Sequence, residues 1–453
     1  MIMKSSDMVT DVLIVGAGPA GLSLAINLGK RYIPSILIEQ KPRKEIGYKP
    51  CGDLLAPTST RRLFELSGIN RPRGEEIAEN LDTAYFRPSE NFEFQFPFPS
   101  MAIDRLKYGQ RLLKSLADYP WIKVYSRYKA IETLIKNDKV IGCKIRKSDG
   151  KHVNIYAKIV ADCSGVIGIV RRNLNPKVTS KIPTKIQKHE TIISYREIIK
   201  TKTKHQYQKQ MRIEARDELP PPGYFWIFSK GIDTLNVGTG WLINDQNKHI
   251  NVKKSLIKLR KKFFPDAEVI DGAGDTLTGR LPLYSMVANG FITCGDSAAL
   301  VNPISGEGHG PALLSAFYAS VVIEKAIREQ RLDERALWEY NIKIWNLYGY
   351  DGGLGVAVQK LLNVIPFSEF AFLFEKGIIT QKDVDAIMDS YYAKIPVVGK
   401  AIKLLQRPKM LIKVIKTLYL AERIKRLSQK YPEDPDYFAK WQKKIMRLEK
   451  KKI

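Results

Sequence analysis

The sequence predicts an α/β fold made of three parts. A short apolar strand, a glycine-rich turn and a helix within residues 11–30, followed by a strand at 35–39, predict a Rossmann-type nucleotide-binding domain. Two β-rich stretches predict an inserted antiparallel β-sheet domain. Helical periodicity after Ala312 predicts a helical C-terminal region. The expected domains are 1–80, 101–182 and 276–330 for the first, 81–100 and 183–275 for the second, and 331–453 for the basic, helical third.

Composition excludes several classes of protein. The chain has 453 residues, of which 44% are hydrophobic and 27% charged, so it is neither disordered nor fibrous. Its four cysteines form no CxxC pair, and its five histidines show no metal-ligand spacing. We therefore expect a reducing compartment, no disulfide scaffold and no metal.

The net charge of +27 predicts anionic partners. The only uncharged run near membrane-spanning length, residues 12–29, is interrupted by glycines, a proline and polar residues, which is typical of buried soluble structure. Any membrane association should therefore be peripheral. We expect a cytoplasmic protein on the cytoplasmic face of the cell membrane.

The glycine-rich turn reads Gly16-Ala17-Gly18-Pro19-Ala20-Gly21. Gly16 permits the tight turn, Gly18 lets backbone N–H groups approach a pyrophosphate, and Gly21 lets the helix pack close to the strand. The helix N-terminus then faces the negative phosphates. Glu39, 18 residues beyond Gly21, is placed to accept hydrogen bonds from ribose hydroxyls. Strand, turn, helix and acid in this order favour dinucleotide binding over a plain glycine loop.

A second motif indicates a flavin. A predicted strand ends in Gly295-Asp296, and Asn302-Pro303-Ile304-Ser305-Gly306-Glu307-Gly308 follows. Asp296 can meet a ribityl or ribose hydroxyl, while the glycines allow a backbone turn to approach an isoalloxazine ring and begin the next helix beneath it.

These motifs together resemble the FAD enzymes of the p-hydroxybenzoate hydroxylase superfamily. Asp162-Cys163-Ser164-Gly165 resembles the central Asp-Gly motif of that superfamily, and Arg105 resembles its phosphate-contacting arginine. The resemblance implies that the first domain binds FAD. The residues expected to bind FAD are Gly16, Gly18, Ala20, Gly21, Glu39, Cys51, Gly52, Arg105, Ala130, Asp162, Asp296, Gly306, Gly308 and His309.

Two further segments resemble geranylgeranyl reductases. Lys49-Pro50-Cys51-Gly52 is similar to their Pro-Cys-Gly motif, and residues 224–240 are similar to their Tyr-x-Trp-x-Phe-Pro signature with a later Gly-x-Gly. Ser229 stands where that family usually has Pro, and His309 where an aliphatic residue is common. The resemblance implies reduction of isoprenoid double bonds in archaeal membrane phospholipid precursors by reduced FAD. The residues expected to bind the geranylgeranyl lipid are Tyr224, Trp226, Phe228, Gly238 and Gly240.

An isolated alkene has no adjacent carbonyl to stabilise an anion, so hydride addition needs a proton as well. The site therefore requires a dry apolar tunnel, a reduced flavin and a proton donor. Cys51 is the candidate donor, because an ordinary thiol with a pKa of about 8.5 is protonated near neutrality and tolerates apolar surroundings. The alternative is a small buried residue that shapes the flavin site. His309 is a second candidate donor, with a structural role as its alternative.

Tyr224, Trp226 and Phe228 alternate, so in a strand they share one face. They either form the wall of a lipid tunnel or pack as ordinary sheet residues. Cys143, Cys163 and Cys294 are expected to be core residues.

The C-terminal segment from Lys400 carries 17 basic and 5 acidic residues, so 17 − 5 gives +12. Its cations fall near helical spacing, at Lys409, Lys413, Lys416, Arg423, Arg426 and Lys430. A broad apolar face accompanies them, made of Met410, Leu411, Val414, Ile415, Leu418 and Tyr419. This pattern predicts either an interfacial helix on an anionic bilayer or a solvated basic face on a helix packed against the FAD domain. Helix breaks are expected at Gly352-Gly353, Pro366, Pro396 and Pro408.

Other functions compete with the reductase. A flavin-dependent monooxygenase or halogenase of the same superfamily would deliver oxygen or halogen, and a non-catalytic, membrane-associated FAD protein would only bind. The electron donor is either an acidic ferredoxin or NAD(P)H. The chain has no second glycine fingerprint for a nicotinamide cofactor, but this superfamily need not have one, and a positively charged surface could equally bind an acidic ferredoxin. No nucleic-acid recognition motif accompanies the basic charge, so we expect no nucleic-acid partner.

Overall fold

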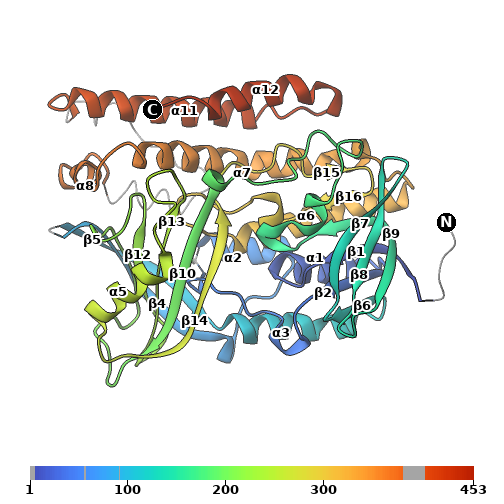
Figure 1. The fold of residues 1–453 in the computed structure, drawn as a ribbon, viewed down its shortest axis with the longest axis horizontal. Helices are drawn as coiled ribbons and strands as arrows, with labels where there is room; N and C mark the ends of the chain where they lie inside the picture. Colours follow the sequence, from blue (N-terminus) through green and yellow to red (C-terminus); the bar gives the residue numbers. More distant parts are fainter. Residues whose placement is uncertain (1–5, 56–57, 91, 381–403) are drawn as a thin grey trace.

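The computed structural model describes residues 6–55, 58–90, 92–380 and 404–453. Two eight-stranded sheets lie at opposite ends of the molecule, and two successive layers of C-terminal helices run across both of them (Figure 1). This arrangement confirms the predicted α/β class. The domain limits remain predictions.

The first sheet has the strand order β15-β16-β9-β1-β2-β6, with the β7–β8 hairpin attached to β9. From β16 to β6 all neighbours are parallel. Residues 12–15 and 36–38 are buried, which is typical of parallel strands covered on both faces. The strands are β1 (Met8–Val15), β2 (Ser35–Glu39), β6 (Ile122–Ser126), β7 (Lys129–Lys136), β8 (Lys139–Arg146), β9 (His152–Asp162), β15 (Val287–Ala288) and β16 (Phe291–Thr293).

Helix α1 (Pro19–Gly29) packs on β1 and β2 of this sheet, and α3 (Arg105–Ser115) and α6 (His309–Arg328) pack against α1. The uncharged run 12–29 forms the second half of β1 and helix α1, and both are buried, as predicted. In the described part of the chain, α6 alone has the length and apolar composition to cross a membrane. It packs against α1 and α7, and most of its apolar window is buried, as in a core helix of a folded domain.

The second sheet has the order β14-β10-β13-β12-β11-β4-β5-β3. Its pairs are antiparallel except β11 with β4, which is parallel and so departs from the predicted all-antiparallel sheet. The predicted pair of strands around Lys230-Gly231 is present as β12 and β13. The strands are β3 (Leu54–Leu55), β4 (Ile77–Ser89), β5 (Phe92–Ile103), β10 (Thr191–Lys200), β11 (Gln210–Glu214), β12 (Tyr224–Ser229), β13 (Thr234–Leu242) and β14 (Glu268–Thr278), and several extend a few residues past the expected limits.

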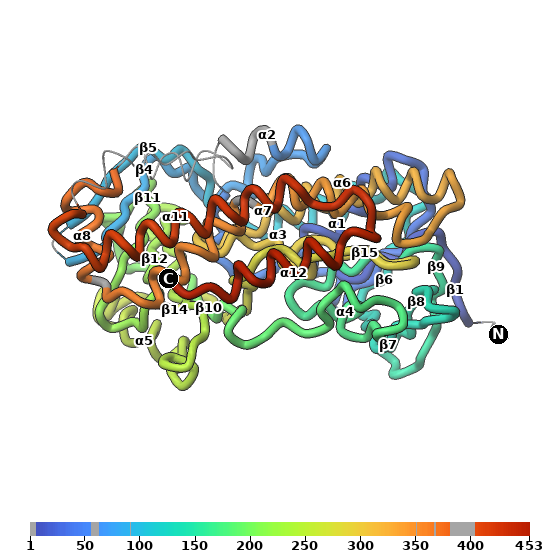
Figure 2. The backbone as a smooth tube through the Cα atoms, turned by 90° about the horizontal axis from the view of Figure 1, so that it is seen from above, coloured from blue at the N-terminus to red at the C-terminus, as the bar shows by residue number. Residues whose placement is uncertain are grey.

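The described part of the C-terminal region contains the helices α7 (Glu334–Leu362), α8 (Phe367–Glu375), α11 (Pro408–Ser428) and α12 (Phe438–Glu449). Helix α11 lies along α7 and forms the outermost layer with α12 (Figures 1 and 2). Pro366 precedes α8 and Pro408 opens α11, as expected of proline at helix starts. Pro396 lies outside the described residues.

The expected break at Gly352-Gly353 is wrong, because both residues lie inside the continuous helix α7. Close packing of α7 against its neighbours explains why glycines occur inside this helix. A Cβ on Gly353 would lie 2.4 Å from Cγ2 of Ile424 in α11, and one on Gly349 would lie 2.5 Å from Oγ of Ser428. A Cβ on Gly355 would lie 2.9 Å from Cδ of Pro303. Glycine therefore serves close helix packing here, although it lowers intrinsic helix propensity.

Candidate active site

One cavity of about 1030 Å³ runs between the two sheets and under the C-terminal helices. Its first end is formed by the turn after β1, the end of β2 and the loop before α6. Its second end is formed by the second sheet together with α7, α8 and α11. The two ends differ in chemistry, so they are described in turn.

The glycine turn after β1 has room for a phosphate group. A Cβ on Gly18 would meet no described atom within 4 Å, so the space in front of this turn belongs to the cavity. Gly16 has a φ of +102°, and a Cβ there would lie 2.6 Å from the carbonyl oxygen of Cys163. A Cβ on Gly21 would lie 1.8 Å from the carbonyl oxygen of Gly16, so α1 can pack here only without a side chain. These residues fit the diphosphate of FAD at the N-terminus of α1.

Glu39 lies at the end of β2 and lines the cavity beside this turn. Its Oε2 accepts a hydrogen bond from the Ala17 N–H at 2.8 Å, and its Oε1 accepts one from the Lys41 N–H at 2.9 Å. Ala20 and Ala130 line the same part of the cavity. The carboxylate is thereby fixed at the rim, where acceptor capacity remains for ribose hydroxyls.

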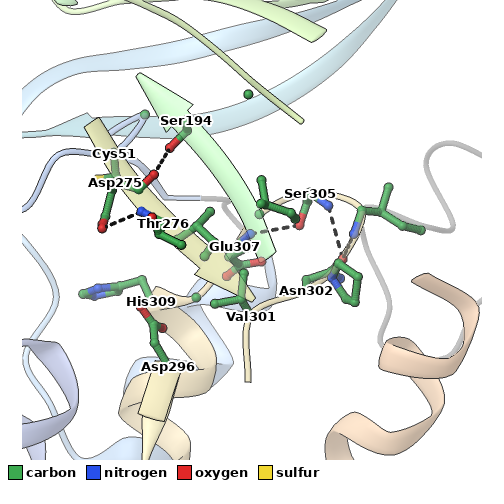
Figure 3. Close-up of a pocket in the computed structure, with 18 of the residues that line it drawn as sticks. Cys51, Ser194, Asp275, Thr276, Asp296, Val301, Asn302, Ser305, Glu307 and His309 are labelled. Atoms are coloured by element: carbon green, nitrogen blue, oxygen red, sulfur yellow. Dashed lines mark hydrogen bonds between the residues drawn. The ribbon is translucent and has the colours of Figure 1, made fainter. Parts of the chain in front are cut away.

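The loop before α6 brings Asp296 and His309 together below residues 302–307, with Cys51 and Asp275 across the cavity (Figure 3). Lys49 Nζ donates to Asp296 Oδ2 at 2.6 Å and lies 3.8 Å from Asp275 Oδ2. Burial alone would lower the pKa of Lys49, but the two carboxylates outweigh it and raise that pKa. Lys49 is therefore a fixed cation in the flavin region. Gly306 and Gly308 also line it.

Cys51 lies at the centre of a polar cluster beside Gly52. Its thiol donates to Asp53 Oδ1 at 3.1 Å, and its sulfur accepts from Arg105 Nε at 3.3 Å and from the Asp53 N–H at 3.3 Å. Burial raises the pKa of Cys51, and the charge of Asp53 adds to this, while Arg105 opposes it. The thiol is therefore protonated at neutral pH, as a proton donor requires.

His309 is held by the same arginine. Nη1 of Arg105 lies 2.6 Å from Nδ1 of His309, so Nδ1 accepts the hydrogen bond. Burial, followed by the charges of Arg105 and Lys49, lowers the pKa of His309 well below its usual value. A neutral imidazole is a weak acid, so the prediction of His309 as a proton donor is disfavoured. Its contact indicates that it positions Arg105.

The second end of the cavity is apolar. Tyr224, Trp226 and Phe228 lie on one face of β12 and line the cavity. This is the arrangement expected if they form the wall of a lipid tunnel. Gly240 lines the cavity from β13. Opposite them are aliphatic and aromatic residues from the C-terminal helices, including Leu361, Phe370, Leu373, Phe374, Leu411, Val414 and Leu418. The shape and lining suit a long hydrocarbon chain.

Comparisons with known proteins agree with this geometry. The family model of the FAD binding domain matches residues 9–205, and that of the geranylgeranyl reductase catalytic domain matches residues 190–274. A digeranylgeranylglycerophospholipid reductase of Sulfolobus acidocaldarius is 27% identical, and the alignment covers 96% of each chain. The chain is thus similar to FAD-dependent geranylgeranyl reductases in both matched regions and along nearly its whole length. Its cofactor is FAD.

Solved structures share the fold of this chain. A geranylgeranyl bacteriochlorophyll reductase-like protein of Thermoplasma acidophilum superposes with a TM-score of 0.74 at 21% identity, covering 91% of this chain and 99% of its own. The flavin-dependent brominase Bmp2 superposes with a TM-score of 0.64 at 16% identity, covering 90% of this chain and 100% of its own. Reductases and halogenases thus share one architecture, and the activity must be argued from the site.

Two residues of the predicted site take other roles in this geranylgeranyl reductase. Asp162 is fully buried, and its carboxylate accepts hydrogen bonds from backbone or side-chain groups of Ser164, Val170, Arg171 and Ser297. It therefore holds the loop behind the site through these contacts, and its contact with FAD stays a prediction. Gly238 likewise lies outside the cavity lining. A Cβ there would lie 2.1 Å from the Trp226 ring, so Gly238 makes room for that indole.

Sequence reasoning did not assign several residues of the reductase site. Asp53, Lys230 and Asn236 surround Cys51, and Asp275 meets Lys49. Asp351 of α7 also lines the cavity, and burial raises its pKa to about 8. Of these residues only Asp53, which directly follows the Pro-Cys-Gly motif, could have been found from the sequence. The others come from strands and a helix that the fold alone brings together.

Proposed function

We propose that this protein is an FAD-dependent reductase that saturates the C=C bonds of geranylgeranyl chains in a membrane glycerophospholipid. The observation that carries the proposal is the single cavity, which is polar and glycine-lined at the FAD end and continuous with an apolar chamber at the other. The relatives are named for this substrate class. When bound, reduced FAD supplies a hydride.

The residues of this chain supply the proton. Protonation of the less substituted alkene carbon builds positive charge on the more substituted one. The Cys51 thiol holds a proton beside the flavin region, and Arg105 Nε and the Asp53 N–H both reach its sulfur and stabilise the thiolate that is left. The apolar lining around Trp226 and Phe228 excludes water, which would otherwise capture the cation.

An anaerobic incubation tests this function. The dithionite-reduced protein is mixed with a digeranylgeranylglycerophospholipid, and the flavin spectrum and lipid mass are followed. We expect flavin reoxidation that depends on the lipid, with the lipid gaining two hydrogens per flavin oxidised. Gain of oxygen or halogen in air would instead support the related monooxygenases or halogenases. Flavin reoxidation at the same rate with and without the lipid would support a protein that only binds FAD.

Helix α11 supports peripheral attachment to an anionic membrane. Its predicted apolar face is divided in the structure, because Leu411, Val414 and Leu418 line the cavity while other apolar residues face outward. The outward residues are Ile412 (54% exposed), Ile415 (50%) and Tyr419 (51%). Ile415 belongs to both sets, so the cavity reaches the surface there, among exposed lysines of α11 such as Lys416. A lipid tail could enter at this point while its phosphate stays among cations.

Vesicle sedimentation tests this attachment. Substitution of Ile412 and Tyr419 by Ser should weaken binding to vesicles of anionic lipid, because the outward apolar face is lost. Ile232→Ser is the matched control, since Ile232 is 66% exposed but lies in the turn between β12 and β13. Equal loss of binding in both variants, or none in either, would contradict attachment through α11. The proposed place is the cytoplasmic face of the cell membrane.

The electron donor stays a prediction, either an acidic ferredoxin or NAD(P)H. The net charge of +27 favours an acidic protein partner. Stopped-flow reduction of the bound flavin by each donor, at low and high salt, compares them. Reduction by ferredoxin should slow with salt, whereas reduction by NAD(P)H alone would exclude the need for a protein donor.

A further inference from the structure

A chain of polar contacts leads from Cys51 toward the surface. The Cys51 thiol donates to Asp53 Oδ1 at 3.1 Å, while Asp53 Oδ2 accepts from Lys230 Nζ at 2.7 Å. The two oxygens of one carboxylate thus face different partners. Lys230 follows β12, and 13% of its side chain is exposed, compared with 6% for Asp53. The carboxylate therefore lies between the thiol and the ammonium, and Lys230 is the more exposed member of the ion pair.

The fold fixes this chain of contacts firmly. Asn236 is fully buried, and its Nδ2 donates both to the Cys51 carbonyl oxygen at 2.8 Å and to Asp53 Oδ2 at 3.2 Å. Its Oδ1 accepts from the indole N–H of Trp226 at 3.0 Å, which ties the cluster to the tunnel wall. Asp53 itself has a φ of +59°, a left-handed conformation that a non-glycine residue adopts only when its surroundings hold it.

We propose that Lys230 and Asp53 form a proton relay that reloads Cys51 after each double bond is reduced. The proposal rests on the function proposed above. Cys51 S–H breaks as a C–H bond forms on the alkene, and the hydride completes the reduction. The Asp53 carboxylate takes a proton at Oδ2 from the Lys230 ammonium. The carboxyl group then rotates so that this proton faces the sulfur, and the proton passes to the Cys51 thiolate. Water finally returns a proton to the Lys230 amine, so one proton enters for each proton used.

The chemistry of the cavity explains why a relay is needed. A geranylgeranyl chain holds several double bonds, and each reduction consumes one proton. Cys51 lines the cavity, so a bound lipid chain and flavin would separate its thiolate from bulk water. Burial raises the pKa of Cys51, so its thiolate is a strong enough base to draw a proton along the relay. Lys230 is partly exposed and supplies the contact with solvent.

Separation of the first turnover from later ones tests the relay. Lys230→Arg is the key variant, since arginine keeps the charge that pairs with Asp53 but does not give up its proton. The reduced holoenzyme is mixed with a digeranylgeranylglycerophospholipid, first without and then with excess dithionite. For Lys230→Arg we expect a first turnover at the wild-type rate and a steady-state rate at least about tenfold below that of the wild type. Lys200→Arg, at an exposed lysine that pairs with Asp233, is the matched control.

Lys230→Met and Asp53→Asn complete the test. Both should slow the steady state, and the loss should shrink as the pH falls, because direct protonation of the thiolate becomes easier. A wild-type steady state in Lys230→Arg, or an equal loss in its first and later turnovers, would overturn the relay. Full first-turnover activity in Cys51→Ala would instead overturn the role of Cys51 in the proposed function. Flavin absorbance of each purified variant reports whether the site is intact.

Discussion

The two ends of the cavity are built in opposite ways. The FAD end takes most of its shape from short motifs, in which Gly16, Gly18 and Gly21 lie within six residues and Glu39 closes the unit. The lipid end takes its walls from strands of the second sheet and from α7, α8 and α11, which are far apart in the sequence. A polar, charged ligand needs individual atoms in fixed places, whereas a hydrocarbon chain needs only volume and apolar surface.

This difference predicts where single substitutions are tolerated. At the FAD end one added methyl group meets backbone or cofactor, and neither can move aside. At the lipid end many side chains share the contact with substrate, so most single changes should alter chain-length preference more than activity. Gly238 is the exception, because it lies against a rigid indole.

The largest expected effect is at Gly18. Gly18→Val should weaken FAD binding by about a hundredfold or more, since its side chain would project into the space for the diphosphate. Thermal unfolding of the FAD-free protein should barely change, because no described atom lies within 4 Å of the new Cβ. Gly21→Ala is the contrasting variant and should lower the stability of the FAD-free protein itself. An FAD affinity unchanged in Gly18→Val would contradict the assignment of this end.

The next effect is at Cys51. Cys51→Ala should retain FAD and reduce lipid about tenfold to a hundredfold more slowly, because the proton donor is lost. In the wild type the rate should be flat through neutral pH and fall only on the alkaline side of the ordinary thiol range, since burial raises the pKa of Cys51. Single-turnover rates across pH check both points. A Cys51→Ala enzyme with the wild-type rate and profile would remove the thiol from the mechanism.

A smaller effect is expected at Gly238. Gly238→Ala should lower turnover of geranylgeranyl chains about fivefold without loss of FAD, because the Trp226 indole must shift from a site 2.1 Å from the new Cβ. Steady-state rates with chains of different length measure this. Addition of Trp226→Phe should restore part of the rate by making room. Failure of that double variant to recover, with FAD still bound, would argue against a steric cause.

The smallest effect concerns Asp351. Burial raises its pKa to about 8, with Glu307 adding to the shift, so it is protonated in the fold at neutral pH but ionised in the unfolded chain. The native state therefore loses stability as pH rises from about 4 to about 8. Asp351→Asn should match the wild type in stability near pH 4 and exceed it by a margin that grows as the pH rises toward about 8. Thermal melts across this range check it, and parallel curves would refute the assignment.

The sequence predicted the FAD end well because its chemistry is local. The turn after β1, Glu39 and the loop before α6 depend on neighbours in the chain, so spacing alone places them. The hydrogen-bond partners of Asp162 could not be predicted, because one of them, Ser297, comes from another motif that only folding brings near. The break at Gly352-Gly353 was wrong because packing of α11 against α7 outweighs helix propensity.

The lipid end was predicted only in part. Alternation in β12 correctly placed Tyr224, Trp226 and Phe228 on one face, because side chains in a strand have a period of two. The wall opposite them could not be predicted, since an apolar helix face looks the same whether it meets a core, a bilayer or a ligand. Helix α11 shows this ambiguity, with one apolar set turned inward and another turned outward.

The glycines of α7 allow close packing both with the outer helix α11 and with the loop beside the flavin region. On one side Gly349 and Gly353 admit α11, and on another Gly355 admits Pro303 of the loop before α6. A helix so rich in glycine is weak by itself and depends on these neighbours for its order. The outer helices therefore hold α7 in place by packing against it. Binding of α11 to a bilayer would then reduce the mobility of the loop before α6, and this would couple the start of the reaction to membrane binding.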